Sequence, residues 1–409
     1  MRHELEGGIL LSCGRIEAVH RKVKRTLSRL DVVAGQAFRG LQTEEGRNRT
    51  ALCVGTFALG LSLFLAFPPL SAFLSGKPSR LQLFAAQCAH PLTRHFFTSE
   101  NYLALRILVP SLAHLIGLRG VQGLAIIYLA NVATLAFIYL LLIRYLKPVV
   151  SFYGTLGLGL TVVCQGSNLY LGCADSVSNL LLVLLLYCPS PLLFFAVPIL
   201  GLINDERFLL GIPLVFLFDV ALKPRPAWLH RTLQNLVACA AGVIVGYGVR
   251  YSLIHGWFGQ PVQQPVYPHL TVLMWGSPLS WAAAWFGSFR AWWIVPVLAW
   301  LTCRKRMERA AVGLIVAYLC VGMIAATTIA DIWRSMGQLF PAFVLCAILI
   351  CRFDEPLSAV TLKSVALLNV LLPTLIVTGS YIGWTRPFPV SVVEYLAGQS
   401  LVRALHLRM

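Results

Sequence analysis

The stretch Asn204-Asp205-Glu206-Arg207 lies between two apolar runs, Pro191 to Ile203 before it and Phe208 to Leu222 after it. Three charges that interrupt apolar sequence are costly at a membrane boundary unless they line a cavity or pair with one another. A second stretch, Asp331-Ile332-Trp333-Arg334, has the same form. We therefore expect the two polar stretches to lie on the same side of a membrane and to line one site.

The bulk composition predicts a membrane protein. Of the 409 residues, 58% are hydrophobic and only 12% are charged. Apolar runs of about 17–25 residues are long enough to span a bilayer, and the chain contains roughly ten continuously apolar runs of about this kind. The sequence therefore predicts an all-α fold, a polytopic membrane helix bundle.

The chain is strongly basic, with a formal net charge of +17. In a membrane protein such an excess is typical of the Lys and Arg bias of cytoplasmic loops. The sequence contains no nucleic-acid motif, so we expect no nucleic acid among the partners. The distribution of these charges places the amino terminus in the cytoplasm.

We divide the chain into three parts. Residues 1–50 form a cytoplasmic head in which Arg15 to Leu41 predicts a basic amphipathic helix, suited to an anionic membrane surface. Residues 51–385 form the transmembrane domain, with a large first external loop at 75–120 that carries two surface helices, Leu81–Cys88 and Tyr102–Leu118. Residues 386–409 form an amphipathic tail.

The transmembrane domain is predicted to contain about eleven spans, in keeping with apolar runs of spanning length. The segments are 51–74, 121–143, 148–165, 176–187, 192–203, 208–222, 232–253, 290–303, 310–330, 335–351 and 363–383. Several have only about 12–15 residues, too short to cross alone at 1.5 Å per residue. Such segments indicate tilted or broken helices around a cavity.

In this topology five carboxylates from four loops share the outer edge of the bundle: Glu100, Asp175, Asp205, Glu206 and Asp331. Five arginines lie at the same level: Arg94, Arg106, Arg207, Arg290 and Arg334. Acids of this kind can act as general bases or hold a divalent cation, and arginines can grip a phosphate group. The shared level is the main evidence for a site.

Simpler interpretations stay open for individual members. Arg207 can form a local ion pair with Asp205 or Glu206 that has no role in a shared site. Asp331 and Arg334, at i and i+3, can form another such pair. Asp175 can be the N-cap of a helix that begins at Ser176. Two cysteines in loops predicted to lie outside, Cys88 and Cys173, can form a disulfide.

The architecture resembles the GT-C superfamily of polytopic glycosyltransferases that use polyprenyl-phosphate-linked sugars. The resemblance rests on the first external loop with two interface helices and covers roughly residues 50–385. Three stretches also look like patterns in bacterial membrane proteins of GT-C type: Cys173-Ala-Asp-Ser-Val-Ser-Asn-Leu-Leu-Leu, Asn204-Asp-Glu-Arg-Phe-Leu-Leu-Gly-Ile-Pro213 and Asp331-Ile-Trp-Arg-Ser-Met-Gly-Gln-Leu-Phe-Pro341.

The resemblance implies an inverting glycosyltransferase at the outer face of a bacterial inner membrane, with a polyprenyl-phosphate-linked sugar as donor. Glu100 or Asp175 would deprotonate the acceptor hydroxyl. Arg207 and Arg334, together with Arg106, would hold the donor phosphate, in a substrate site lined by Asp205, Glu206 and Asp331. If a divalent cation takes part, Asp175 and Asp205 are its expected ligands.

A flippase or transporter of a lipid-linked glycan or another anionic substrate is the main alternative. It would need the same arginines but no catalytic base. A polysaccharide polymerase or ligase of another fold is a third hypothesis, less favoured because the long external loop comes early in the chain.

Overall fold

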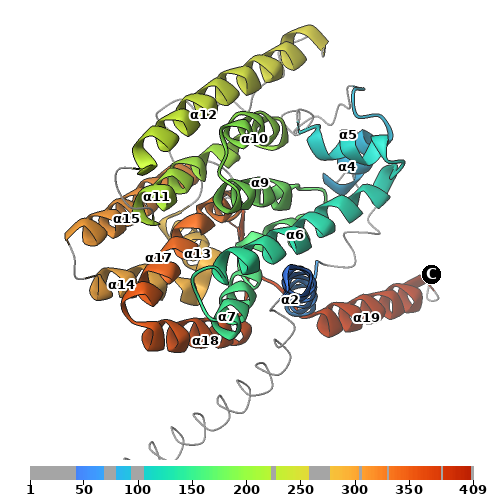
Figure 1. Ribbon diagram of the computed structural model, residues 1–409. Helices are drawn as coiled ribbons and strands as arrows, with labels where there is room; N and C mark the ends of the chain where they lie inside the picture. The colour runs from blue at the N-terminus through green and yellow to red at the C-terminus, as the bar shows by residue number, and fades with distance from the viewer. Residues whose placement is uncertain are drawn as a thin grey trace, which may run out of the picture.

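The computed structural model of the chain describes residues 43–68, 80–93, 106–222, 227–257, 277–303, 306–328, 331–378 and 381–406. Within these residues the structure is a bundle of α-helices with one short β-hairpin (Figure 1). The predicted amphipathic helix Arg15–Leu41 lies outside the described residues, as do Arg94 and Glu100.

Within the described residues, six helices or helix pairs are long and apolar enough to cross a membrane. They are Glu44–Leu65 (α2), Gly120–Leu142 (a short 3₁₀ turn followed by α6, Leu124–Leu142), Pro148–Leu169, His230–Ser252 within α12 (Ala227–Ser252), Glu308–Thr327 within α15 (Arg306–Thr327), and Ile332–Phe353. These spans make the chain a candidate multi-pass membrane protein.

The spans divide into central and peripheral ones. The segments Pro148–Leu169 and Ile332–Phe353 are each 83% buried within the protein, whereas His230–Ser252 is only 22% buried. The central segment Ile332–Phe353 contains α16 (Ile332–Met336) and α17 (Phe340–Phe353), in which every residue from Phe340 to Ile350 is buried. In Figure 1, α12 lies at the edge of the bundle beside α10.

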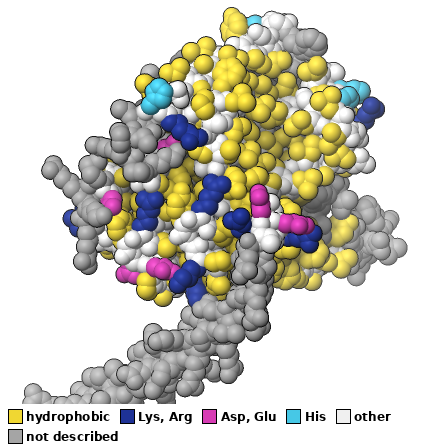
Figure 2. Space-filling view, viewed as in Figure 1, with side chains coloured by type: hydrophobic (Ala, Val, Ile, Leu, Met, Phe, Trp, Pro, Cys, Tyr) yellow, Lys and Arg dark blue, Asp and Glu magenta, His cyan; other side chains and the backbone are white. Residues whose placement is uncertain are grey.

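The surface of the bundle is apolar. Large side chains such as Ile244 of α12 and Leu371 of α18 are more than two-thirds exposed, at 71% and 70%. Figure 2 shows a face whose upper part is covered widely by hydrophobic side chains, whereas Lys, Arg, Asp and Glu side chains gather across its lower part. Contiguous apolar surface on this scale is expected where helices face lipid rather than water.

Shorter helices complete the bundle, and all but α13 match short segments predicted from sequence. They are α9 (Asp175–Tyr187), α10 (Pro191–Asn204), α11 (Ile212–Leu222), α13 (Pro278–Phe289) and α14 (Ile294–Thr302). The predicted segment 148–165 is a broken helix: α7 (Pro148–Gly159) ends, and α8 (Val162–Leu169) restarts with the Thr161 hydroxyl accepting a hydrogen bond from the Val163 amide.

The predicted span 363–383 is wrong. Helix α18 (Glu355–Leu371) ends before Pro373, and the chain continues as the antiparallel strands β1 (Leu375–Thr378) and β2 (Tyr381–Trp384). Proline disfavours helix at the residue before it and removes a backbone donor, and the β-branched residues that follow favour extended structure. The apolar run concealed this change of secondary structure.

Other predicted boundaries move by less. Helix α2 begins at Glu44, inside the predicted head, because the Thr43 hydroxyl accepts a hydrogen bond from the Gly46 amide and caps the helix. Of the two predicted surface helices, the first is α4 (Arg80–Ala89) and the second is shorter than expected, α5 (Leu108–Leu115). The predicted tail contains α19 (Phe388–His406).

The disulfide alternative is also wrong, because Cys88 and Cys173 are both free and buried.

Helices α2 and α6 approach each other closely at one glycine. A Cβ atom on Gly55 would lie 2.6 Å from the carbonyl oxygen of Val132, whereas a Cβ atom on Gly60 of the same helix would meet nothing within 4 Å. Backbone at 2.6 Å cannot yield as a flexible side chain can, so the glycine is required for this contact.

This difference predicts opposite effects for two matched substitutions. Gly55→Ala should destabilise the folded protein by about 1–3 kcal/mol because the two helices must move apart. Gly60→Ala should stabilise it by up to about 1 kcal/mol, since alanine favours the helix. Thermal unfolding of the full-length protein in detergent measures both, and equal effects would contradict the packing described here.

Candidate functional site

Nine charged residues form one continuous chain of ion pairs at one end of the bundle, called the charge network below. In order, with signs alternating, they are Arg250, Glu206, Arg106, Asp205, Arg207, Asp175, Arg334, Asp331 and Arg80. Five arginines and four acids leave one net positive charge. Ion pairs therefore join segments that are far apart in sequence at this end of the bundle.

The centre of the charge network is the carboxylate of Asp175. Its Oδ1 accepts hydrogen bonds from Nη2 of Arg207 at 2.9 Å and from Nη2 of Arg334 at 2.7 Å, and its Oδ2 accepts one from Nε of Arg334 at 2.6 Å. The three side chains are at most 4% exposed. Charge-assisted bonds in such a buried setting are strong, and each charge depends on its partners.

Polar side chains of neighbouring helices hold Asp175 in place at the start of α9. The amide of Ser176 donates to the Ser167 hydroxyl of α8 at 2.8 Å. The Asn204 side chain, at the end of α10, donates to the Ala174 carbonyl and to the Ser178 hydroxyl, both at 2.9 Å. The end of α10 is thus fixed to the start of α9, which brings Asp205 and Asp175 to the same level.

Asp205 joins the network from the turn between α10 and the 3₁₀ helix Glu206–Leu210. Its carboxylate pairs with Arg106 at 2.9 Å and accepts a hydrogen bond from Nε of Arg207 at 2.9 Å. Burial alone would raise the pKa of Asp205, but the two guanidinium groups outweigh burial and hold the pKa well below its usual range. Asp205 therefore stays ionised.

Asp331 closes the other side of the network. It pairs with Nη1 of Arg334 at 2.8 Å and with Arg80 at 3.3 Å. Burial would raise the pKa of Asp331, but the charge of Arg334 and then that of Arg80 lower it to about 2. A carboxylate with so low a pKa is a weak base and serves better as a fixed negative charge.

The mouth of the network is a small cleft of about 20 Å³, lined by Arg80 and Gln87 of α4, Arg106, and the turn at Gly172 and Cys173. The Tyr170 ring lies 5.6 Å from the Arg80 guanidinium carbon and 5.4 Å from that of Arg334. Gly172 has φ of +88°, and a Cβ there would meet the Arg80 carbonyl oxygen at 2.9 Å. Only glycine allows this turn to lie against α4.

Arg207 and Asp331 each have one buried atom with no hydrogen-bond partner within the described part of the chain, Nη1 of Arg207 and Oδ1 of Asp331. Buried polar atoms are normally paired, so such atoms call for an explanation. One is a donor and the other an acceptor, and both belong to side chains that are otherwise fully engaged.

Seven of the eight residues that the sequence nominates belong to the charge network, and the eighth, Glu100, lies outside the described residues. The local pairs Asp205–Arg207 and Asp331–Arg334 do form, but both arginines also bind Asp175, so the pairs are not isolated. The N-cap interpretation of Asp175 is wrong, since the Asp175 side chain makes no cap hydrogen bond and α9 begins at Asp175 itself.

Sequence reasoning missed Arg80, Arg250 and Tyr170. Arg80 stands one residue before a predicted surface helix, which places it at the right level, whereas nothing local marks Arg250 or Tyr170. Arg290 does not join the network, because its Nη1 donates to the carbonyls of Asn369 and Leu372 at the end of α18. Among the described residues no group of three or more His, Cys, Asp or Glu side chains is arranged to hold a metal ion.

Comparison with protein-family models, with curated proteins and with solved structures gives no match.

The network predicts a large loss of stability when one central charge is removed. Arg334→Gln leaves Asp175 with one arginine in a buried site, which should cost about 3–5 kcal/mol of unfolding free energy. Adding Asp175→Asn should restore part of this stability, because the buried carboxylate that lost its partner is then removed. Asp331 does not become unpaired in either variant, since it also pairs with Arg80. Unfolding in detergent gives the double-mutant cycle.

Arg49 supplies the control, because it forms an exposed pair with Glu45 on the surface of α2. Arg49→Gln should cost no more than about 1 kcal/mol. Equal losses for Arg334→Gln and Arg49→Gln would contradict a buried network.

Proposed function

We propose that the chain is a membrane glycosyltransferase that moves a sugar from a polyprenyl-phosphate donor to an acceptor at the outer face of the cell inner membrane. The observation that carries the proposal is the charge network: arginines and acids from separate segments meet at one end of an apolar bundle. An anionic headgroup on a lipid fits a basic site at a membrane boundary.

The donor phosphate is assigned to Arg80 and Arg106. Both reach the cleft at the mouth, and their side chains are 20% and 13% exposed, unlike those of Arg207 and Arg334. Arg334 uses all three guanidinium nitrogens on acids, so it serves to hold Asp175. A phosphate is larger than the cleft, and its binding would displace the ends of the two flexible side chains at the mouth.

The base is assigned to Glu100. Both Asp175 oxygens are already bound by arginines, and the low pKa of Asp331 makes it a weak base. The base takes the proton of the acceptor hydroxyl, the acceptor oxygen bonds to the anomeric carbon, and the bond from that carbon to the phosphate oxygen breaks. Polyprenyl phosphate leaves with the electron pair, and the configuration inverts.

The proposal includes a finer topology of about ten spans, which are the predicted spans without the one at 363–383, with the amino terminus in the cytoplasm. The short helices α9, α10, α11 and α14 would account for the crossings that the six long spans do not. Asp175 starts α9 and Asn204 ends α10, so the two helices run in opposite directions, as successive crossings must.

An apolar groove of about 520 Å³ between α14 and α15 supports a lipid-linked substrate. Trp300 and Gly313 line one end of it and Trp293 and Met323 line the other. Eight residues after Met323 the chain reaches Asp331 of the charge network. We assign the polyprenyl tail to this groove, which faces the region that the exposed apolar surface places in lipid.

The flippase alternative has one observation in its favour. The ion pairs join separate helices and leave only about 20 Å³ at the mouth, as a closed gate would. A flippase needs no base, which separates the two candidates by experiment.

Sugar transfer in membranes from expressing cells, with a panel of labelled polyprenyl-phosphate sugars, tests the proposal. Glu100→Gln should lower transfer at least about 10²-fold, the usual contribution of a general base. Arg80→Gln with Arg106→Gln should lower it similarly, and the exposed Arg119→Gln should have no effect. Full transfer by the Glu100→Gln variant would overturn the proposal. A wild-type protein that flips lipid-linked sugars but shows no transferase activity would also overturn it.

The groove predicts dependence on donor chain length. Ala317 lines the groove, and Ala317→Trp should fill it and reduce transfer from long-chain donors about tenfold while sparing short-chain ones. Leu314→Trp is the control, because Leu314 is 56% exposed on the same helix but does not line the groove. Equal effects on both chain lengths would remove the groove from the site.

A further inference from the structure

A second pocket lies at the end of the bundle opposite the charge network. Asp175 begins α9 and Tyr187, at the far end of its 13 residues, lines this pocket. A helix of that length spans about 20 Å. The pocket is therefore a different place from the charge network, and it is called the Arg144 pocket below.

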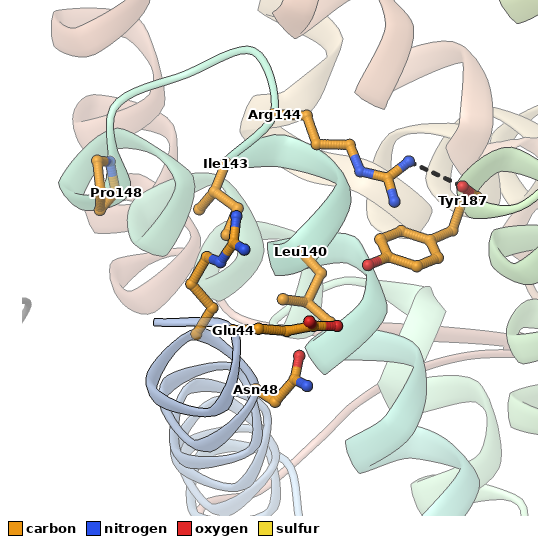
Figure 3. Close-up of a pocket in the computed structure, with 8 residues that line it drawn as sticks. Glu44, Asn48, Leu140, Ile143, Arg144, Pro148 and Tyr187 are labelled. Carbon is orange, nitrogen blue, oxygen red and sulfur yellow. Dashed lines mark hydrogen bonds between the residues drawn. The ribbon is translucent and has the colours of Figure 1, made fainter. Parts of the chain in front are cut away.

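The Arg144 pocket has a volume of about 400 Å³, within the range of ligand sites. Its polar wall includes Glu44, Arg47 and Asn48 of α2 and Arg144 after α6, and its apolar wall includes Leu140 and Ile143. Figure 3 shows Glu44 and Asn48 of α2 facing the Tyr187 side chain across Leu140. The pocket thus offers charge on one side and hydrocarbon on the other.

Arg144 is held in a fixed position. Its guanidinium carbon lies 3.7 Å from the centre of the Tyr187 ring, and its Nη1 donates to the Tyr187 carbonyl at 2.8 Å (Figure 3). Among the described residues this is the one hydrogen bond of the Arg144 side chain. Its other donors form no ion pair with a carboxylate among the described residues, so a cation with spare donors stands at the wall of the pocket.

Neighbouring basic residues are already neutralised. Lys147 pairs with Glu355 at 2.8 Å, and this pair raises the pKa of Lys147. Arg49 pairs with Glu45. Arg47, by contrast, makes no side-chain ion pair with any other described residue. Arg47 and Arg144, which form no ion pair with a described acid, both line the pocket.

The level of the pocket identifies the kind of ligand. Glu44 begins α2 and Leu142 ends α6, and both helices are candidate spans, so the pocket lies where helices leave the membrane. Arginine forks match phosphate, and basic pockets between helices at the cytoplasmic boundary suit anionic lipid headgroups. Leu140 and Ile143 would contact the first carbons below such a headgroup.

We propose that the Arg144 pocket binds the phosphodiester headgroup of an anionic phospholipid, with Arg47 and Arg144 on the phosphate. Glu44 and Asn48 would accept or donate hydrogen bonds to headgroup hydroxyls. The site is independent of the charge network and of any reaction there. It gives the chain a lipid contact at the face where the sequence places the cytoplasm.

Native mass spectrometry of the delipidated full-length protein tests the site, with phosphatidylglycerol as probe and its chain-free analogue glycerophosphoglycerol as comparison. Wild type should retain phosphatidylglycerol, and Arg47→Gln, which breaks no ion pair within the described structure, should weaken binding about tenfold. Arg47→Gln with Arg144→Gln should weaken it further. Arg49→Gln, two residues away on α2, should bind as wild type does.

Equal binding by wild type and Arg47→Gln would overturn the proposal, and so would equal weakening by Arg49→Gln, which would indicate general surface charge. If glycerophosphoglycerol binds as well as phosphatidylglycerol, the proposal of a lipid ligand is wrong, and the pocket is assigned to a soluble phosphate compound. Thermal unfolding of each variant without lipid confirms that the variants are folded.

Discussion

The carboxylate of Asp175, held between Arg207 and Arg334, is the interaction on which the structure depends. Three charges at most 4% exposed in an apolar bundle are tolerable only as partners of one another. They come from α9, from the 3₁₀ helix Glu206–Leu210 after α10 and from α16, so their ion pairs hold the ends of three segments at one level. The central helix α17 follows α16 after one 3₁₀ turn, Gly337–Leu339, so the network also fixes the start of one of the two most buried spans.

The two ends of the bundle use charge differently. At the network end, acids and arginines alternate and almost cancel, and the two arginines that reach the cleft, Arg80 and Arg106, are still paired. At the opposite end, Lys147 and Arg49 are neutralised on the surface, and Arg47 and Arg144 stand over a pocket of about 400 Å³. The same residue type thus holds the fold together at one end and presents donors at the other.

The sequence predicts the all-α bundle and the composition of the network because both depend on short-range signals. Apolar runs mark helices, and polar interruptions such as Asp205-Glu206-Arg207 mark their ends. It could not predict that Asp175 would bind both arginines, or that Arg250 and Tyr170 would take part, since those contacts depend on how helices pack. It also failed at 363–383, where hydropathy is the same for a helix and for a hairpin and only Pro373 and the β-branched residues distinguish them. The catalytic role of Glu100 stays a prediction.

The most direct test of the account is the sidedness of the two ends. Single cysteines in place of Glu206, at the network, and Lys147, at the opposite end, would be introduced into a cysteine-free chain and probed in intact cells with an impermeant thiol reagent. Their side chains are 32% and 73% exposed, so both are accessible. The account predicts that the cysteine at 206 labels from outside and that the one at 147 labels only after the membrane is permeabilised. Labelling of both from the same side would contradict a network and a second pocket on opposite faces of the membrane.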